Sequence, residues 1–292
     1  MPASIRPRRS VLFLPGSNPR AIEKARELPA DGVIFDLEDA VAPEAKNAAR
    51  AAVASALTAG GYGPRELILR VNPQGSAWGP ADLAAAATLP IDAVLLPKVE
   101  NAESVRLALD RLAALGAPPA LDVWCMIETP LGVLAAPQIA AAGPRLAALV
   151  LGTSDLSKDL RVRETRDRLP LLTALGLVLL AGRAHGRAIL DGVHLDLADA
   201  EGFAASCRQG RELGFDGKTL IHPQQIAPAN AAFSPSDEEV ARAGRLIAAY
   251  AEATAAGTGA IRVEGRLVEA LHVEEARRTL ALAAAIAERE AG

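Results

Sequence analysis

The stretch Gly32-Val-Ile-Phe-Asp-Leu-Glu-Asp-Ala-Val41 places three consecutive apolar residues directly before the carboxylates Asp36, Glu38 and Asp39. A short apolar run of this kind is typical of a strand that is buried on both faces of a parallel sheet. The carboxylates fit two interpretations: a chain that leaves the core toward a helix cap, or a metal or acid–base site. The rest of the sequence bears on this choice.

Seven further apolar runs alternate with longer segments rich in Ala, Leu, Arg and Glu, which have a helical composition. The eight predicted strands cover residues 10–15, 32–37, 66–72, 92–98, 121–128, 147–152, 187–193 and 215–222. Helices are predicted between them, as in 43–59, 101–115, 171–185 and 199–213. Strands that alternate with helices indicate parallel βαβ units, and eight such units favour a closed (β/α)8 TIM barrel over an open sheet.

The predicted barrel covers residues 1–228, and a small C-terminal helical extension or lid covers residues 229–292. The extension is expected to contain a helix (236–255), a Gly-rich link (255–260), a hairpin (261–268) and a final helix (274–290). A chain of 292 residues has the ordinary length of one large barrel.

Composition excludes several classes of protein. The formal net charge of −4 argues against nucleic acid as a partner, and no apolar run approaches the roughly 20 residues of a membrane-spanning helix. Cys125 and Cys207 fall in apolar strand-like and helix-like runs, so we expect buried thiols and a cytoplasmic protein. No dinucleotide-binding, P-loop or nucleophile-elbow motif occurs, and the four histidines lack zinc-like spacing.

Nearly every predicted strand ends in a charged side chain, and the active sites of (β/α)8 barrels lie at the C-terminal strand ends. Beyond the three acids of the second strand, these groups are Arg70, Lys98, Glu128, Asp155, Asp191 and Lys218. Carboxylates without a His or Cys cluster suit a hard cation such as Mg²⁺. Glu128 and Asp155, which follow neighbouring strands, are the best pair of ligands; for Asp155 the alternative is a helix cap.

Two of the three cations among these groups, Arg70 and Lys98, have different expected uses. Arg70, in Leu69-Arg-Val-Asn72, suits bidentate capture of a substrate carboxylate, and an internal ion pair with a neighbouring acid is the alternative. Use of Lys98 as a Schiff-base amine is disfavoured, because a lysine among so many acids keeps its charge and is a poor nucleophile.

Eight segments resemble, in order, the citrate lyase β-subunit-like and malyl-CoA lyase group of the HpcH/HpaI aldolase superfamily. Within about residues 8–225 they read RSVLFLPG, FDLEDAVAPEAKNAAR, LRVN, LLPKVE, IETP, GTSDL, LDGVHLD and GFDGKTLIHPQQI. The resemblance implies a carbon–carbon lyase with a TIM barrel and one Mg²⁺ per subunit. The bond in question joins a 2-oxo or 2-hydroxy acid to an acyl-CoA thioester of the citryl-, malyl- or citramalyl-CoA type. A homo-oligomer, trimeric or hexameric, is also implied.

The resemblance assigns roles to individual residues of this sequence. Glu128 and Asp155 would ligate Mg²⁺, and Arg70, together with Glu128, would contact the substrate. The acids of the second strand would hold the waters of the metal and orient the arginine, and Lys98 would support them.

One motif departs from the pattern of longer family members. These end in a G-x-M-I-D motif whose aspartate, often from the lid of a neighbouring subunit, serves as acid or base. Here the matching stretch is Gly265-Arg-Leu-Val-Glu269. Displacing the carboxylate by a methylene can cost about 100-fold in rate. Glu269 is therefore the first candidate for the general acid or base, and another base or a different reaction is the alternative.

Phosphates of CoA need cations at the rim of the site, and four residues near the first strand are candidates: Arg8, Arg9, Arg20 and Lys24. Ordinary solvated surface is their alternative. Three other activities stay open at this point: a malyl-CoA-type thioesterase, an aldolase acting on free 2-oxo acids without CoA, and a citrate lyase β subunit that depends on an acyl-carrier protein.

Overall fold

The computed structural model describes residues 5–255, 257 and 259–291. One compact unit is Arg8–Phe233, and the residues from Ser234 onward form a second unit with the N-terminal residues up to Pro7. The division predicted after residue 228 stays a prediction; residue 228 lies inside a helix of the first unit.

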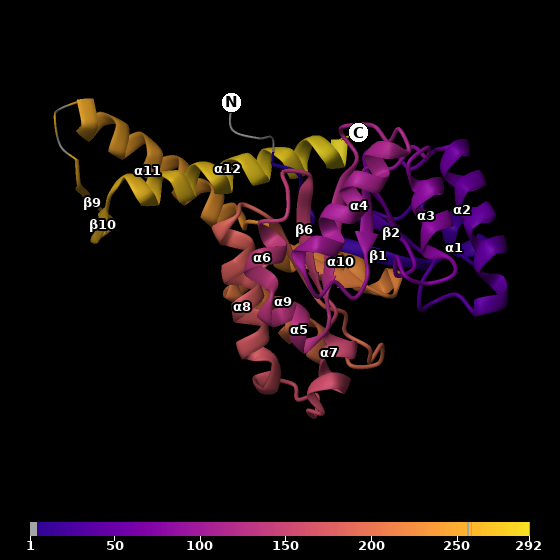
Figure 1. Cartoon of the computed structure of the whole chain (residues 1–292). Coiled ribbons are helices and arrows are strands. Elements are labelled where there is room, and N and C mark those ends of the chain that lie inside the picture. The colour runs from indigo at the N-terminus through magenta and orange to yellow at the C-terminus, as the bar shows by residue number, and fades with distance from the viewer. Residues whose placement is uncertain (1–4, 256, 258, 292) are drawn as a thin grey trace. The chain divides into compact units, whose positions relative to one another are not determined.

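Eight parallel strands close into a barrel in the first unit, in sequence order (Figure 1). They are β1 (Ser10–Pro15), β2 (Gly32–Asp36), β3 (Glu66–Arg70), β4 (Ala93–Leu96), β5 (Asp122–Ile127), β6 (Leu146–Leu151), β7 (Ala188–Asp191) and β8 (Gly217–Leu220). The ring is closed because β1 pairs with both β2 and β8. The (β/α)8 barrel predicted from the alternating runs is therefore confirmed.

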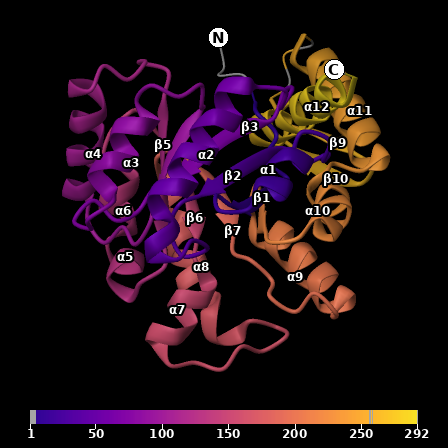
Figure 2. The same ribbon diagram turned by 90° about the vertical axis from the view of Figure 1, so that its right-hand side faces the viewer.

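Helices follow the strands and surround the barrel (Figure 2). They are α1 (Pro19–Lys24), α2 (Lys46–Ala59), α3 (Gly79–Ala86), α4 (Ala102–Ala114), α5 (Pro130–Leu134), α6 (Ala136–Ala140), α7 (Thr153–Leu160), α8 (Leu172–Ala184), α9 (Ala200–Leu213) and α10 (Ile226–Phe233). Local sequence sets their ends: Asn101 caps α4 by accepting the N–H of Ser104, and Gly214, with φ of 103°, terminates α9. No helix among the described residues has both the length and the apolar character needed to cross a bilayer.

Two apolar layers pack on the two faces of the closed sheet. Ile34 and Trp124 belong to a small cluster inside the barrel, whereas Phe35 and Cys125 belong to the larger cluster between the strands and the helices. Neighbouring residues fall in different clusters because strand side chains alternate between the two faces. The same alternation decides which charged side chains enter the barrel. Both cysteines are buried free thiols, as expected.

The C-terminal unit contains α11 (Asp237–Ala255), β9 (Ile261–Val263), β10 (Arg266–Val268) and α12 (Ala270–Ala291). α11 and α12 lie side by side, and the two strands pair as an antiparallel hairpin (Figure 1). Glu264 and Gly265 connect the strands with φ of 51° and 80°, as two-residue hairpin turns require. The expected hairpin is therefore confirmed. The final helix begins at Ala270 rather than at residue 274. Residues 256 and 258 of the predicted link lie outside the described residues.

Candidate active site

Three predicted site residues lie inside the barrel at the C-terminal end of its strands. Asp36 and Arg70 end β2 and β3 and pair in register, and Glu128 directly follows β5. Asp36 comes two residues after Ile34, which faces the interior. By the same alternation Glu128 follows the interior residue Met126. The sheet therefore brings together groups that are far apart in the sequence.

The guanidinium of Arg70 is held by carboxylates on two sides. Its Nε and Nη2 donate to the two oxygens of Asp36, each at 2.6 Å, and Nη1 lies 2.9 Å from Glu38 Oε2. The ring of Phe13 lies 4.9 Å from the guanidinium carbon. Burial lowers the pKa of Arg70, but the ion pairs with Asp36 and Glu38 outweigh burial and raise it overall. The internal ion pair that the sequence left as an alternative is thus present, and it fixes the orientation of the arginine.

Lys98 connects the acids of the second strand to Glu128. Its Nζ forms an ion pair with Glu38 Oε1 and lies 3.4 Å from Asp39 Oδ2. Its backbone N–H, at a residue with φ of 50°, donates to Glu128 Oε1 at 2.7 Å. Burial raises the pKa of Glu38; burial also acts on Asp39, but the hydrogen bond with Glu38 and the charges of Lys98 and Arg70 lower its pKa. The two neighbouring carboxyl groups therefore differ in proton affinity.

Glu128 is a buried carboxylate without a cation at its side. Its exposed fraction is 1%, and no Lys, Arg or His of the described residues lies within ion-pair distance. Burial raises the pKa of Glu128 to about 7, against the weaker influence of Lys98. Buried charges in proteins are paired or bind metals, so a bound cation fits this carboxylate.

Glycine at position 152 allows Glu128 its place. A Cβ atom on Gly152 would lie 2.3 Å from the Cβ of Glu128 and 2.5 Å from its Oε2, closer than atoms can approach. β5 and β6 pair at Ile127 and Leu151, which sets the two residues next to each other. The sequence does not predict this contact, because Glu128 and Gly152 follow different strands and meet only when β5 and β6 pair.

Asp155 lies in the first turn of α7, with an exposed side-chain fraction of 30% and Lys158 Nζ at 3.4 Å. Among the residues that the structure describes, no group of three or more His, Cys, Asp and Glu side chains is arranged to hold a metal. Glu128 and Asp155 therefore stay predicted ligands; with two protein carboxylates, a hard cation such as Mg²⁺ would take its remaining oxygens from water or substrate.

The four cations proposed for CoA phosphates lie in two places. Arg8 and Arg9 precede β1, at the opposite end of the barrel from the carboxylates. Arg8 donates twice to Glu66 at 2.7 Å, and Arg9 pairs with the buried Asp31. Their position does not fit the predicted contact, because an apolar barrel interior separates them from the site. Arg20 and Lys24 are exposed on α1, directly after the C-terminal end of β1.

Asp191, at the end of β7, and Lys218, which lies near the start of β8 rather than at its end, face away from the barrel interior. Asp191 is fully buried, with Lys218 Nζ at 2.8 Å and Arg168 Nη1 at 2.7 Å. A Cβ on Gly210 of α9 would lie 3.0 Å from the Asp191 carboxylate, so this cluster packs between the strands and α9. The ring of charges expected from the strand ends is thus divided between the two faces of the sheet, because side chains one residue apart point to opposite faces.

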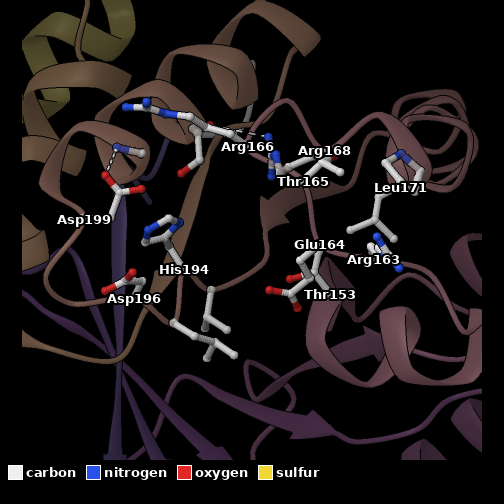
Figure 3. A pocket seen from close by; sticks show the side chains of 15 residues that line it. Thr153, Arg163, Glu164, Thr165, Arg166, Arg168, Leu171, His194, Asp196 and Asp199 are labelled. Atoms are coloured by element: carbon white, nitrogen blue, oxygen red, sulfur yellow. Dashed lines mark hydrogen bonds between the residues drawn. The ribbon is translucent and has the colours of Figure 1, made fainter.

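A cavity of about 320 Å³ lies beside the start of α7 rather than at the carboxylates (Figure 3). His194 and Asp196 lie on one wall, and Glu164 and Arg163 come from the segment between α7 and α8. Thr153 is the residue of this cavity that lies nearest in sequence to a predicted ligand. A second cavity of about 180 Å³ is lined by Asn72, Ser104 and Lys98, and through Lys98 it adjoins the carboxylate cluster.

Glu269 belongs to the C-terminal unit, where it lies between β10 and α12. Its side chain is exposed, and its backbone N–H donates to His272 Nδ1 at 3.1 Å. The role that the resemblance implies for this glutamate stays a prediction.

Comparison with known proteins identifies the family to which the chain belongs. The model of the HpcH/HpaI aldolase/citrate lyase family matches residues 9–223. The chain belongs to this family. A family member from Cereibacter sphaeroides (strain KD131 / KCTC 12085), named (3S)-malyl-CoA thioesterase, is 52% identical over 281 residues, which cover 96% of each chain.

Other members of the family carry a different name. Citrate lyase subunit beta of Leuconostoc mesenteroides subsp. cremoris is 37% identical over 281 residues, covering 94% of this chain and 93% of that one. Among solved structures, protein CitE of Mycobacterium tuberculosis, in complex with magnesium, acetoacetate and coenzyme A, aligns with a TM-score of 0.78 and 34% identity. That alignment covers 94% of this chain and 97% of that one. The family resemblance predicted from the eight motifs is therefore confirmed.

Proposed function

We propose that the protein is a Mg²⁺-dependent hydrolase of malyl-CoA-type thioesters. The observation that carries the metal part is the buried carboxylate of Glu128, which pairs with no cation among the described residues and lies near a guanidinium that is already fixed in orientation. The thioesterase part is supported by the relative that bears that name and aligns over 96% of both chains.

Four residues of the chain would bind or orient the metal and the substrate. Glu128 and Asp155 would hold Mg²⁺, which as a Lewis acid polarises the substrate oxygens that it contacts. Arg70 would bind the substrate carboxylate through Nη1 in place of its 3.5 Å contact with the sulfur of Met126, since Asp36 occupies Nε and Nη2. The backbone N–H of Lys98 would orient Glu128.

Proton transfer and CoA binding need further groups. In hydrolysis, water adds to the thioester carbonyl, the carbon–sulfur bond breaks, and the thiolate of CoA takes up a proton. Glu269 is our candidate for the carboxylate that accepts the proton of the water and returns it to the sulfur. Arg20 and Lys24, exposed after β1, are our candidates for contact with the CoA phosphates.

The second candidate is cleavage of the carbon–carbon bond of the same substrates. It is supported by the relatives named citrate lyase subunit beta, at 36–37% identity, and by the roles that the resemblance gives to Arg70 and Glu128. In this reaction the hydroxyl proton of the malyl group is removed, the bond between C2 and C3 of the acid breaks, and the released acyl-CoA carbanion is protonated. Both reactions require the substrate carboxylate to be bound in the same way, and they differ in the bond that breaks.

Products distinguish the two reactions directly. Purified protein with Mg²⁺ is incubated with malyl-CoA, citramalyl-CoA and citryl-CoA, and the products are identified by mass spectrometry. Hydrolysis of malyl-CoA yields malate and free CoA, whereas cleavage yields glyoxylate and acetyl-CoA. EDTA and the variant Glu128→Gln should abolish either reaction. Release of acetyl-CoA would replace the thioesterase proposal with the lyase, and no product from any of the three esters would overturn both.

A further inference from the structure

A buried lysine lies beside the acids of the candidate site. Lys46 is the first residue of α2, and its exposed fraction is 6%. Its Nζ donates to the backbone carbonyls of Leu37 and Glu38 at 2.9 and 2.7 Å, and the ring of Trp78 lies 5.4 Å away. In the part of the chain that the structure describes, no carboxylate lies within ion-pair distance of this ammonium group.

This placement is unfavourable by two general rules. A buried charge without a counter-ion costs free energy, and a cation at the N-terminus of a helix opposes the helix dipole. A methionine would fill similar space without either cost. Carbonyl oxygens and the face of an indole ring offset only part of the lost hydration. The ammonium group is therefore best explained by what it holds in place.

What it holds is the segment between β2 and α2 that carries the site acids. Glu38 and Asp39 reach Arg70 and Lys98 from this segment. The two carbonyls that Lys46 binds belong to Glu38 itself and to Leu37 directly before it. Fixing these two peptide groups therefore fixes where the carboxylate of Glu38 can point.

A second polar contact supports the same peptide from the other side. Asn72 Nδ2 donates to the carbonyl of Leu37 at 2.9 Å, and Asp82 holds this amide at 2.7 Å. Arg50, one turn after Lys46 on α2, donates to Asp82 at 2.6 Å. Two cations of α2 thus support the same peptide group: the buried Lys46 binds its carbonyl directly, and the half-buried Arg50 acts through Asp82 and Asn72.

The positive and negative charges near this segment are equal in number only when Lys46 is included. Asp36, Glu38 and Asp39 carry three negative charges when ionised, and Arg70 and Lys98 supply two positive charges in contact with them. Lys46 supplies the third positive charge, through its hydrogen bonds to the carbonyls of Leu37 and Glu38. The two proposed metal ligands then face a divalent cation without excess charge from their neighbours.

We propose that Lys46 is a positioning residue that fixes the segment Leu37–Asp39, so that Glu38 holds Lys98 and Arg70 in the geometry needed to bind the substrate carboxylate. The kinetic part of this inference rests on the proposed function, whereas its structural part does not. Lys46 acts through Glu38 and touches neither substrate nor metal.

The chain offers a matched control for the removal of such a cation. Arg65 lies before β3, at the opposite end of the barrel, and its guanidinium also donates to two backbone carbonyls, those of Leu28 and Tyr62, at 2.6 and 2.7 Å. The variants Lys46→Met and Arg65→Met remove the same kind of contact, one behind the site and one far from it. Lys46→Arg retains a cation that can donate to both carbonyls.

The first measurement is amide hydrogen exchange by mass spectrometry, which needs no substrate. The amides of Leu37, Glu38, Ala40 and Val41 are all hydrogen-bonded in this segment. We expect them to exchange at least about tenfold faster in Lys46→Met, to keep the wild-type rate in Arg65→Met, and to recover in Lys46→Arg. Unchanged exchange in Lys46→Met, or equal acceleration in Arg65→Met, would overturn the inference.

The second measurement is the steady-state kinetics of thioester turnover at a temperature where every variant is folded. Residues that support the ligands of a site typically change affinity or activity by 10–100-fold. We expect Lys46→Met to raise KM for the malyl thioester by about this factor with a smaller change in kcat, and Arg65→Met to stay within about twofold of wild type. A wild-type KM in Lys46→Met would overturn the kinetic part. A wild type that turns over no thioester would instead count against the proposed function, and the exchange result would still decide the role of Lys46.

Discussion

Arg70 donates two hydrogen bonds of 2.6 Å to the carboxylate of Asp36, its partner in register across β2 and β3. Two parallel N–H···O bonds hold a guanidinium in a defined plane. The third nitrogen, Nη1, lies 2.9 Å from Glu38 Oε2 and donates to the sulfur of Met126 at 3.5 Å. Asp36 therefore orients the arginine, and the weak contact of Nη1 with Met126 is the one that a substrate would replace.

Replacing Asp36 with Asn should loosen this orientation. Removal of one partner from a buried ion pair destabilises a protein by about 3–5 kcal/mol, and we expect KM for the thioester to rise by about tenfold or more. Urea unfolding and steady-state kinetics measure the two effects. The matched control is Asp92→Asn, which weakens a hydrogen bond to the Leu67 N–H of 2.8 Å before β4. Equal KM in the two variants would contradict an orienting role for Asp36.

The proton affinity of Glu128 should make Mg²⁺ binding depend on pH. Burial raises the pKa of this carboxyl to about 7, so below pH 7 the metal must displace a proton. Apparent affinity should then rise with pH, by about tenfold per unit below pH 7, and level off above it. Calorimetric titration with Mg²⁺ at pH 6, 7 and 8 measures this. A flat profile would contradict the assignment of Glu128 as a ligand, and Glu128→Gln should bind Mg²⁺ weakly at every pH.

Adding a methyl group at position 152 should displace Glu128. The new Cβ of Gly152→Ala would lie 2.3 Å from that of Glu128, so the carboxylate or the backbone must move, and a shift of about 1 Å can cost about 100-fold in rate. Gly176→Ala, in α8, is the control, because a Cβ there meets nothing within 4 Å. It should keep full activity and gain up to about 1 kcal/mol of stability. Activity is followed by release of CoA, and full activity of Gly152→Ala would refute the close contact.

The buried cluster around Asp191 should matter for stability more than for activity. Asp191→Asn leaves Lys218 and Arg168 without their common counter-ion, and we expect a loss of about 3–5 kcal/mol in the free energy of unfolding. Arg168→Met leaves Asp191 paired with Lys218 at 2.8 Å and should cost about 1–2 kcal/mol. Denaturant unfolding monitored by circular dichroism gives both values. The reverse order would show that Arg168 is the dominant partner.

Glu269 is open to a test that stability does not confound. It is exposed, so Glu269→Gln should unfold at the temperature of the wild type. If it transfers protons in the reaction, kcat should fall by about 10²–10⁴-fold with little change in KM. Glu274→Gln, exposed on α12, should leave kcat unchanged. An equal kcat in Glu269→Gln and wild type would exclude the proton-transfer role and direct attention to another base.

The number and order of the strands could be predicted from the sequence because each strand is a short, continuous apolar run between longer helical segments. The same pattern shows that charged residues follow the strands, as Asp36, Arg70 and Glu128 do. The resemblance in eight ordered segments predicted the family. Each of these signals is local, because a single apolar run, strand-end charge or motif spans fewer than twenty neighbouring residues.

The position of a charged residue along the chain does not show at which end of the barrel its side chain lies. Arg8 and Arg20 are near neighbours in sequence, yet the strand between them carries one to each end of the barrel. The supporting role of Lys46 is also not predicted from the sequence, although one feature of the sequence points to it. A lysine in the first turn of a helix opposes the helix dipole, and such an exception indicates a specific partner.

The amino-acid order alone accounts for the apolar runs, the barrel they form and the family, since periodicity and motifs are properties of neighbouring residues. Closure of the sheet decided the rest. It turned Asp36, Arg70 and Glu128 inward and Asp191 outward, because side chains alternate and only one face of each strand meets the interior. It also brought the Lys98 N–H to Glu128. These partners come from different βα units, and no local pattern states how such units will pack.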